Sequence, residues 1–556
     1  MKTPHQRFWL LLKPDTKEIN QVYTYSFFKG VIALSLPIGI QSIINLIQGG
    51  RISTSWILLI AIVIIGIALG GYMQLMQMRI TENIQQNIFT RAAFDFTYRI
   101  PRIKLEALYN QYAPELMNRF FDVLAIQKSL AKIIIEFSTA ILQILFGLIL
   151  LSLYHPFFII YSLLLIVLVY TIIKLTYKKG LSSSLSESKY KYKMASWLEE
   201  LARSKDSFKL AGTTLLPEKK TDEHVLGYLQ YREEHYGILR KQYILLLVFK
   251  ILVALSLLLV GGLLVLNQQM NIGQFVAAEI IILLIIESSE KIILNLENVF
   301  DILTSLEKIG QITDFELDDQ EDTSSLNHTI EKPLSVEIKD LVFSYPGRQT
   351  PVLNNFSFEF KSNYNYCISG ENQSGKSTLL HLIAGLYHPQ EGTICVNNYP
   401  LANYNLPKLY KIIGNGLSEE SIFEGTIREN IILGRDGISN EDLEWALKHI
   451  KLNDFVKQQE KGIDTNLDVS GHKQSESVIQ KILIARSIVN KPKLLLLENQ
   501  LTSIQESERK EIIAFLTDKK NNWTLIVISN DMEMLNVCDE VIEMDKGIIK
   551  NIKKRN

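Results

Sequence analysis

Long apolar runs recur through residues 1–313 of the 556-residue chain, whereas the rest mixes apolar and polar positions as a soluble domain does. A helix needs about 20 mostly apolar residues to cross a bilayer. Six runs reach this length, at 27–47, 55–78, 133–153, 156–176, 243–267 and 273–297. The pattern predicts an all-α six-helix transmembrane domain.

The connections between these runs alternate in charge. The short ones, near 48–54, 154–155 and 268–272, hold a single Lys or Arg, which is Arg51. The N-terminal segment and the two long connections hold many, and loops rich in Lys and Arg tend to stay in the cytoplasm. We therefore expect a multi-pass protein of the cell (inner) membrane with both long loops and both chain ends in the cytoplasm. The formal net charge of −1 gives no reason to expect nucleic acid as a partner, and the lipid bilayer is the expected surrounding.

Ionisable residues are few within the apolar runs. Glu279 and Glu287 lie deepest in the last run, two turns apart on one helix face. Charged side chains at such depth usually face a cavity or the bundle interior. Two roles stay open for them: contact with a transported substrate, or a structural hydrogen bond inside the bundle.

An acidic, serine-containing stretch at 314–332 follows the last apolar run. Beyond it, residues 335–338 and 342–345 alternate as strands do, and a mixed α/β pattern continues to the end. We therefore predict a transmembrane domain over 1–313 with two long cytoplasmic loops, a linker over 314–332, and an α/β domain over 333–556. The three cysteines of the α/β domain have spacings that fit neither a metal site nor a disulfide scaffold.

Residues 370–377 read GENQSGKS, which matches the phosphate-binding pattern G-x-x-x-x-G-K-[ST] at every position. In this pattern the glycines let backbone N–H groups turn toward a phosphate chain, Lys376 reaches the β- and γ-phosphates, and the Ser377 hydroxyl serves Mg²⁺. The loop follows the strand-like segment 366–369 and precedes the apolar helical start 378–383, and a helix N-terminus favours anions. The sequence predicts an α/β P-loop nucleotide-binding domain whose cofactors are ATP and Mg²⁺.

Six spans followed by such a loop resemble an ABC exporter half-transporter, and most closely the peptide and type I protein-secretion exporters. Several segments follow in the order of that family: Tyr345 before the loop, IFEGTIRENI at 422–431, ARSI at 485–488, the apolar run 494–497, VIS at 527–529 and DKG at 545–547. In the membrane part, 114–120 resembles the G-E-L-x-x-R motif of the first cytoplasmic loop, where a short helix docks on the nucleotide domain.

The resemblance implies a role for individual residues. Tyr345 is expected to stack on adenine, and Ser377 and Glu498 are expected to bind the metal. The remaining nucleotide-binding positions that it implies are Gly370, Asn372, Ser374, Gly375, Lys376, Thr378, Ser418 and Ser475.

Four positions depart from the family pattern in groups that the family uses for catalysis. After the apolar strand the family has Asp then Glu, where this chain has Glu498 then Asn499, and a neutral amide cannot accept a proton. The switch histidine of the family is Asn530 here, which cannot carry a proton at neutral pH. The glutamine that links phosphate and metal to the membrane loops falls at Ser418, whose side chain is too short for that distance.

The family signature L-S-G-G-Q is also altered. Residues 464–478 align without a gap to the family segment D-T-x-x-G-E-x-G-x-x-L-S-G-G-Q, so the signature becomes QSESV at 474–478. Ser475 is retained, and Glu476 adds a carboxylate near the expected position of a γ-phosphate. An alternative register places the signature at 470–473, but this register needs about five inserted residues between the signature and the ARSI segment.

The resemblance implies a subunit of an ATP-dependent exporter, with a peptide or protein as the expected cargo and a periplasmic adaptor as a further expected partner. A second half-transporter completes each nucleotide site in this family, as a homodimer or a heterodimer, and the altered motifs favour the heterodimer. We expect a chain that binds ATP and is a poor ATPase alone. The alternative is a pseudo-ATPase membrane scaffold or regulator that binds ATP and exports nothing itself.

Overall fold

The computed structural model describes residues 2–49, 54–318, 332–417, 421–468 and 473–555. The chain divides into two compact units. The membrane unit comprises residues 1–101 and 112–315, and the nucleotide unit comprises residues 102–111 and 316–556. The segment 102–111 lies within the predicted transmembrane domain 1–313, yet it belongs to the nucleotide unit. Most of the predicted linker, 319–331, lies outside the described residues.

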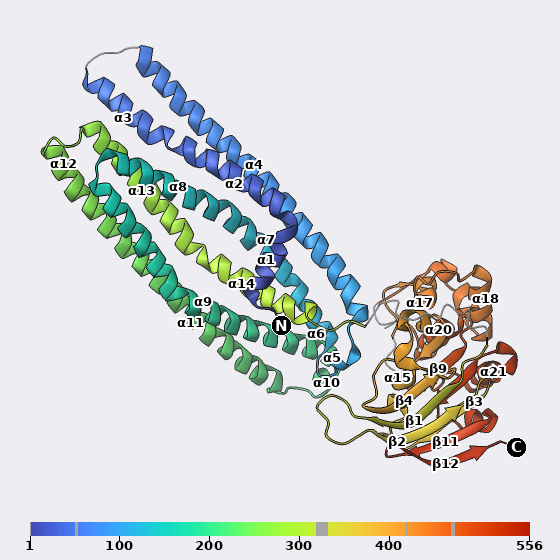
Figure 1. Cartoon of the computed structure of the whole chain (residues 1–556). Helices are drawn as coiled ribbons and strands as arrows, with labels where there is room; N and C mark the ends of the chain where they lie inside the picture. The colour runs from blue at the N-terminus through green and yellow to red at the C-terminus, as the bar shows by residue number, and fades with distance from the viewer. Residues whose placement is uncertain (1, 50–53, 319–331, 418–420, 469–472, 556) are drawn as a thin grey trace. The chain divides into compact units, whose positions relative to one another are not determined.

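Six helical segments in the described part of the chain are long and apolar enough to cross a membrane. They confirm the six predicted spans, and each extends beyond its apolar run. Figure 1 shows the long helices of this unit running side by side. The six segments are Pro4–Gln48, Thr54–Arg102, Ala113–Tyr154, Phe157–Arg203, Leu216–Leu266 and Ile272–Thr313.

Most of these segments are built from several consecutive helices, which are joined by short 3₁₀- or π-helical stretches or by single residues. The helices of the membrane unit are α1 (Pro4–Leu12), α2 (Thr16–Ala33), α3 (Ser35–Gln48), α4 (Thr54–Arg99), α6 (Ala113–Met117), α7 (Asp122–Lys132), α8 (Ser138–Tyr154), α9 (Phe157–Arg203), α10 (Lys205–Leu210), α11 (Leu216–Ser256), α12 (Gly262–Leu266), α13 (Ile272–Leu294) and α14 (Leu296–Thr313).

Polar side chains join these helices in the interior of the membrane unit. The Gln77 amide of α4 donates to the Ser26 hydroxyl of α2 at 2.6 Å, and Ser26 and Ser138 share a hydrogen bond of 2.8 Å. On the other side of the unit, the Gln242 amide of α11 donates to the Thr176 hydroxyl of α9 at 2.9 Å. Such bonds stabilise helix pairs in a bilayer because lipid offers the buried groups no alternative partner.

The two glutamates of the last span differ in their surroundings. The Glu287 side chain is 65% exposed and accepts a hydrogen bond from Lys291 one turn further on, at 2.7 Å. Glu279 is half-buried. Between helices, Lys250 of α11 instead pairs with Glu290 of α13 at 2.6 Å. A substrate contact by Glu279 or Glu287 stays a prediction.

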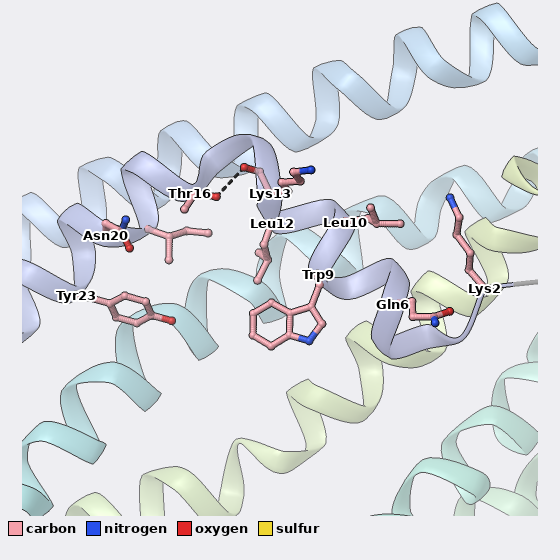
Figure 2. Close-up of a pocket in the computed structure, with 10 residues that line it drawn as sticks. Lys2, Gln6, Trp9, Leu10, Leu12, Lys13, Thr16, Asn20 and Tyr23 are labelled. Carbon is pink, nitrogen blue, oxygen red and sulfur yellow. Dashed lines mark hydrogen bonds between the residues drawn. The ribbon is translucent and has the colours of Figure 1, made fainter.

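A hollow of about 780 Å³ lies where α1 turns into α2 (Figure 2). Trp9, Leu12 and Tyr23 line it, and the Thr16 hydroxyl donates to the Lys13 carbonyl oxygen at the turn, at 2.7 Å. Aromatic and lysine side chains of this kind are typical of helix ends at a membrane surface. This corner therefore fits the start of the first span.

The nucleotide unit contains a six-stranded sheet in the order β12-β11-β3-β10-β9-β6 and a four-stranded sheet in the order β2-β1-β4-β5. In the first sheet β11, β3, β10, β9 and β6 run parallel, and β12 is antiparallel to β11. The strands of the first sheet are β3 (Asn365–Gly370), β6 (Ile413–Gly416), β9 (Leu494–Glu498), β10 (Thr524–Ile528), β11 (Glu540–Asp545) and β12 (Ile548–Lys554). Those of the second are β1 (Val336–Phe343), β2 (Leu353–Phe360), β4 (Glu391–Val396) and β5 (Tyr399–Pro400).

Central parallel strands are buried on both faces, which explains their unbroken apolar runs. On β9, Leu494 and Leu496 pack in one core cluster, and Leu495 and Leu497 pack in the other. The helices around the sheets (Figure 1) are α15 (Lys376–Ile383), α16 (Leu406–Tyr410), α17 (Ile427–Ile432), α18 (Asn440–His449), α19 (Asn453–Lys457), α20 (Glu476–Ile488), α21 (Glu506–Leu516) and α22 (Met532–Val537). The predicted fold class, a six-helix transmembrane domain followed by an α/β P-loop domain, is confirmed.

The segment 102–111 contains the short helix α5 (Leu105–Leu108) and joins the nucleotide unit through its backbone. The Lys104 N–H donates to the Glu316 carbonyl oxygen at 3.0 Å, and the Asp318 N–H donates to the Arg102 carbonyl oxygen at 2.8 Å. The motif at 114–120, which resembles the docking motif of the first loop, lies in the membrane unit instead. There the Arg119 guanidinium donates to the Gln311 side chain at 2.8 Å.

Candidate nucleotide site

The P-loop connects the central strand β3 to the N-terminus of α15. Gly370 and Gly375 have positive φ angles of +139° and +96°. A Cβ at Gly370 would lie 2.2 Å from the Met544 carbonyl oxygen, and one at Gly375 would lie 2.9 Å from a Leu353 methyl group. Only glycine fits both positions, so the loop glycines are required by backbone shape as well as by the phosphate pattern.

The Lys376 amine lies over the loop and donates three hydrogen bonds. Its acceptors are the carbonyl oxygens of Gly370 at 2.9 Å and Glu371 at 2.6 Å, and the Ser374 hydroxyl at 3.1 Å. Burial lowers the pKa of Lys376, and the nearby Glu498 carboxylate acts in the opposite direction. The amine is thus held at the loop, where it can exchange carbonyl partners for phosphate oxygens.

Ser377 and Glu498 are brought together from distant parts of the sequence. The Ser377 hydroxyl, in the first turn of α15, donates to the Glu498 carboxylate at the end of β9. Glu498 is buried, and both side chains offer the oxygen donors that Mg²⁺ prefers. The described residues contain no group of three or more His, Cys, Asp or Glu that could hold a metal. A magnesium site needs no such group, because this ion is usually bound by one or two carboxylates together with phosphates and water.

Tyr345 lies between the P-loop helix and the segment 102–111. Its hydroxyl shares a hydrogen bond of 3.0 Å with the buried Thr378 hydroxyl of α15. The Tyr109 ring lies parallel to the Tyr345 ring, with 4.6 Å between the ring centroids and 9° between their planes. Tyr345 is therefore next to the P-loop helix and carries a second aromatic ring on one face, and its stacking on adenine stays a prediction.

Asn499 and Asn530 follow neighbouring strands at the same edge of the sheet. Glu498 of β9 pairs in register with Ile528 of β10, so both asparagines lie beyond the carboxyl ends of the strands, as the P-loop does. Asn499 is exposed, has a left-handed φ of +53°, and donates its backbone N–H to the Ile528 carbonyl oxygen at 3.2 Å. Asparagine is one of the few residues that adopt this conformation readily. Asn530 is exposed.

The other predicted residues are not all part of this arrangement. Ser374 is buried and Asn372 is exposed on the loop. Ser475 is the N-cap of α20, where its hydroxyl accepts from the Val478 N–H at 3.4 Å, and Glu476 beside it is exposed. Ser418 lies outside the described residues.

Two buried polar residues support the site without being predicted to do so. The Gln480 side chain of α20 accepts from the Ser503 N–H at 2.9 Å and donates to the Thr502 hydroxyl at 3.1 Å, which fixes the segment after Asn499. The Arg486 guanidinium donates to the carbonyl oxygens of Asn430 at 2.7 Å and Ser421 at 3.1 Å. Both family segments, 422–431 and 485–488, were evident in the sequence, but no local pattern indicates that they are in contact.

Residues 353–501 match the family model described as ABC transporter. An export ATP-binding/permease protein of Rickettsia bellii is 32% identical over 218 residues, which cover 39% of this chain and 38% of the relative. The uncharacterized ABC transporter ATP-binding protein YknU of Bacillus subtilis is 30% identical over 298 residues, which cover 53% of this chain and 50% of the relative. An ATP-dependent lipid A-core flippase of Vibrio cholerae is 26% identical, over 38% of this chain and 37% of the relative. The chain thus spans half or less of the length of these curated relatives.

A solved structure extends the likeness to nearly the whole chain. The structure of a bacterial Atm1-family ABC exporter with ATP bound has a TM-score of 0.85 and 17% sequence identity, and covers 97% of this chain and 95% of the other. At this identity the match shows the fold. Together with the six apolar helices, these findings describe a multi-pass membrane protein. Residues 353–501 form an ABC transporter domain, and the chain as a whole has the fold of an ABC exporter.

Proposed function

We propose that this chain is a subunit of an ATP-dependent membrane exporter that binds ATP and hydrolyses it poorly alone. One observation carries the proposal. A complete P-loop, with Lys376 over the loop and Ser377 in contact with Glu498, lies beside Asn499, where hydrolysis needs a base. The described part of the site has groups suited to binding, whereas the position that follows β9 carries an amide, which cannot accept a proton from water.

Binding is supported by the chemistry of the loop. Backbone N–H groups at the start of α15 and the Lys376 amine suit the phosphates, and Tyr345 beside them suits adenine. Ser377 and Glu498 would hold Mg²⁺, which neutralises phosphate charge when it is bound.

Weak hydrolysis follows from the two asparagines. A positioned general base contributes roughly 10²- to 10⁴-fold to rate, and the Asn499 amide cannot accept a proton. Asn530 cannot carry the proton that a switch histidine carries. Both residues are exposed at the sheet edge that bears the P-loop, which supports contact with a nucleotide, and neither amide can activate water as a base.

A second half-transporter is the proposed partner, and a heterodimer is favoured. In a homodimer both sites would lack the base, and each would face a helix start bearing Ser475 and Glu476. A carboxylate close to a phosphate is unfavourable because like charges repel strongly where water is excluded. We place the chain in the inner membrane with the nucleotide unit in the cytoplasm. A peptide or protein cargo and a periplasmic adaptor stay predictions from the resemblance.

The test is nucleotide binding and steady-state hydrolysis by the purified full chain, with Lys376→Ala as control. We expect ATP binding that the control abolishes, and turnover no higher than that of the control. Turnover that the control removes would contradict the proposal, because another group, such as Glu498, would then supply the base.

The same two asparagines favour a second candidate, a pseudo-ATPase scaffold that uses ATP binding to order a membrane complex. Co-purification followed by transport in vesicles separates the two. An exporter subunit acquires ATP-driven transport when a half-transporter with intact motifs is added. A scaffold binds its complex in an ATP-dependent way and drives no transport with any such partner.

A further inference from the structure

The segment 102–111 brings an aromatic ring to the proposed adenine site from outside the α/β domain. Tyr109 stacks on Tyr345 with 4.6 Å between ring centroids and 9° between ring planes. This is an offset-stacked pair of the kind that stabilises aromatic contacts. Stacked rings approach to about 3.5 Å between planes, so no third ring fits between them. Adenine and Tyr109 cannot occupy the same face of Tyr345 together.

The other rings around Tyr345 belong to the core of the nucleotide unit. Phe343 and Tyr387 cross Tyr345 nearly at right angles, at 82° and 89°, and are only 2% and 9% exposed. Tyr109 is 42% exposed and follows the four-residue helix α5. Tyr109 is therefore the ring that can leave Tyr345 without opening the core.

The rest of the segment holds Tyr109 in place through contacts with residues other than Tyr345. Glu106 accepts from the backbone N–H of His388 at 2.9 Å and lies 3.0 Å from its ring Nδ1. Ile103 forms an antiparallel bridge with Leu317, and Leu105 packs against the core that contains Phe343. These contacts keep Tyr109 at high local concentration beside Tyr345, which makes it an effective competitor.

We propose that Tyr109 is an autoinhibitory plug of the adenine site: it covers Tyr345, and ATP must displace it to stack there. The proposal rests on the function proposed above, because it takes Tyr345 as the adenine-stacking residue. If adenine displaces Tyr109, nucleotide binding releases the segment 102–111. The segment therefore responds to the base of the nucleotide and not to its phosphates.

The experiment compares two probes, Mg·ATP and inorganic tripolyphosphate, on the purified full chain. Tyr109→Ala is expected to tighten ATP binding by about two- to tenfold, the equivalent of one lost stacking contact, and to leave tripolyphosphate binding unchanged. Tyr109→Phe keeps the ring and is the matched control, with binding as in the unmodified chain. Weaker ATP binding in Tyr109→Ala would show that Tyr109 supports adenine, and unchanged binding would show no competition; either result overturns the plug.

A second measurement needs no variant. Hydrogen exchange of 102–111 in the unmodified chain is expected to become faster with ATP and to stay unchanged with tripolyphosphate. Slower or unchanged exchange with ATP would overturn the proposal. Lys376→Ala separates a failure of the plug from a failure of the proposed function. If Lys376→Ala abolishes ATP binding but Tyr109→Ala leaves it unchanged, only the plug is overturned. An unmodified chain that binds neither probe overturns the proposed function, and the plug with it.

Discussion

At the scale of single residues, the contact between Ser377 and Glu498 indicates which groups would bind a metal ion. Glu498 is 4% exposed, and its carboxylate accepts from the Ser377 hydroxyl across the carboxyl end of the sheet. The family has the shorter aspartate at this position. The Glu498 carboxylate and the Ser377 hydroxyl are in direct contact, so these two groups together are the proposed ligands of a metal ion.

We predict that Glu498→Gln weakens the metal dependence of ATP binding. The amide keeps the size and a hydrogen-bond acceptor for Ser377, but it loses the charge that a hard cation needs. The gain in ATP affinity on adding Mg²⁺ should fall by about tenfold, and affinity without Mg²⁺ should stay equal or rise. Equilibrium binding with and without the ion measures both values.

Glu371→Gln is the matched control for this prediction. Glu371 is exposed on the P-loop, so the variant removes the same charge close to the phosphates without touching Ser377. It should raise ATP affinity with and without Mg²⁺ alike and leave their ratio unchanged. If both variants lower the ratio equally, Glu498 does not act as a ligand.

The residues of the P-loop could be predicted from sequence because their chemistry is local. Gly370, Gly375, Lys376 and Ser377 lie within eight positions, and each is required by the shape or charge of one loop. Tyr109 could not be predicted, since its contact with Tyr345 joins two distant segments and neither has a pattern that indicates stacking. The same holds for Gln480, a polar residue whose partners follow the next strand.

At the scale of elements, α17 and α20 pack in one apolar core and are also linked by the buried cation Arg486. Thr426 and Glu429 form a capping box at the start of α17, which accounts for the spacing T-x-x-E in the segment 422–431. The Asn430 amide then donates to the Phe423 carbonyl oxygen at 2.9 Å, and Arg486 of α20 reaches the Asn430 carbonyl oxygen at 2.7 Å. The family segments therefore form one structural network.

We predict that Arg486→Met lowers the free energy of unfolding of the nucleotide unit by about 3 kcal/mol, because it leaves the buried Asn430 carbonyl oxygen without its charged donor. The free energy of unfolding of Arg486→Lys should lie between those of the unmodified chain and Arg486→Met, since one ammonium cannot reach both carbonyl oxygens in the same geometry. Hydrogen exchange of the central strands β9 and β10 in the full chain reports this free energy.

Arg348→Met serves as the control for the arginine network. Arg348 is exposed in the same unit, and surface substitutions of this kind usually change stability by about 0.5 kcal/mol or less. Equal losses in Arg486→Met and Arg348→Met would contradict the role that we assign to the buried guanidinium.

At the scale of the whole molecule, the pattern of apolar positions predicted a membrane unit and a nucleotide unit. It did not predict that the segment 102–111 belongs to the nucleotide unit. Apolar runs long enough for a bilayer and unbroken apolar strands are strong signals, so six spans and an α/β domain followed from sequence. The segment 102–111 is short and polar, and its place in the nucleotide unit depends on backbone pairing with residues 316–318. Pairing of this kind leaves no periodic trace in either segment.

The attachment of this segment should depend on pH through Glu106 and His388. The hydrogen bond with Glu106 raises the pKa of His388, with burial and Lys104 opposing and Asp318 assisting. Burial pushes the pKa of Glu106 upward, but the hydrogen bonds and charge of His388 outweigh it, so that pKa is lowered. Because its pKa is raised, His388 stabilises the attachment of the segment fully below pH 6.5, and this stabilisation is lost as the pH rises through the raised value. Because its pKa is lowered, Glu106 stabilises the attachment fully above pH 4.5, and this stabilisation is lost as the pH falls through the lowered value.

We therefore predict that 102–111 is most firmly attached between pH 4.5 and pH 6.5, the ordinary values of the two groups, and loosens once His388 loses its proton. Hydrogen exchange of 102–111, corrected for the intrinsic pH dependence of exchange, should show falling protection above that range. His388→Gln keeps the backbone N–H that binds Glu106 but has no proton to lose, so its protection should be lower and flat with pH. An identical pH profile in His388→Gln would assign the effect to another group. Because Tyr109 belongs to this segment, loosening it should also uncover Tyr345, so ATP affinity should rise with pH in the unmodified chain and stay level in the variant.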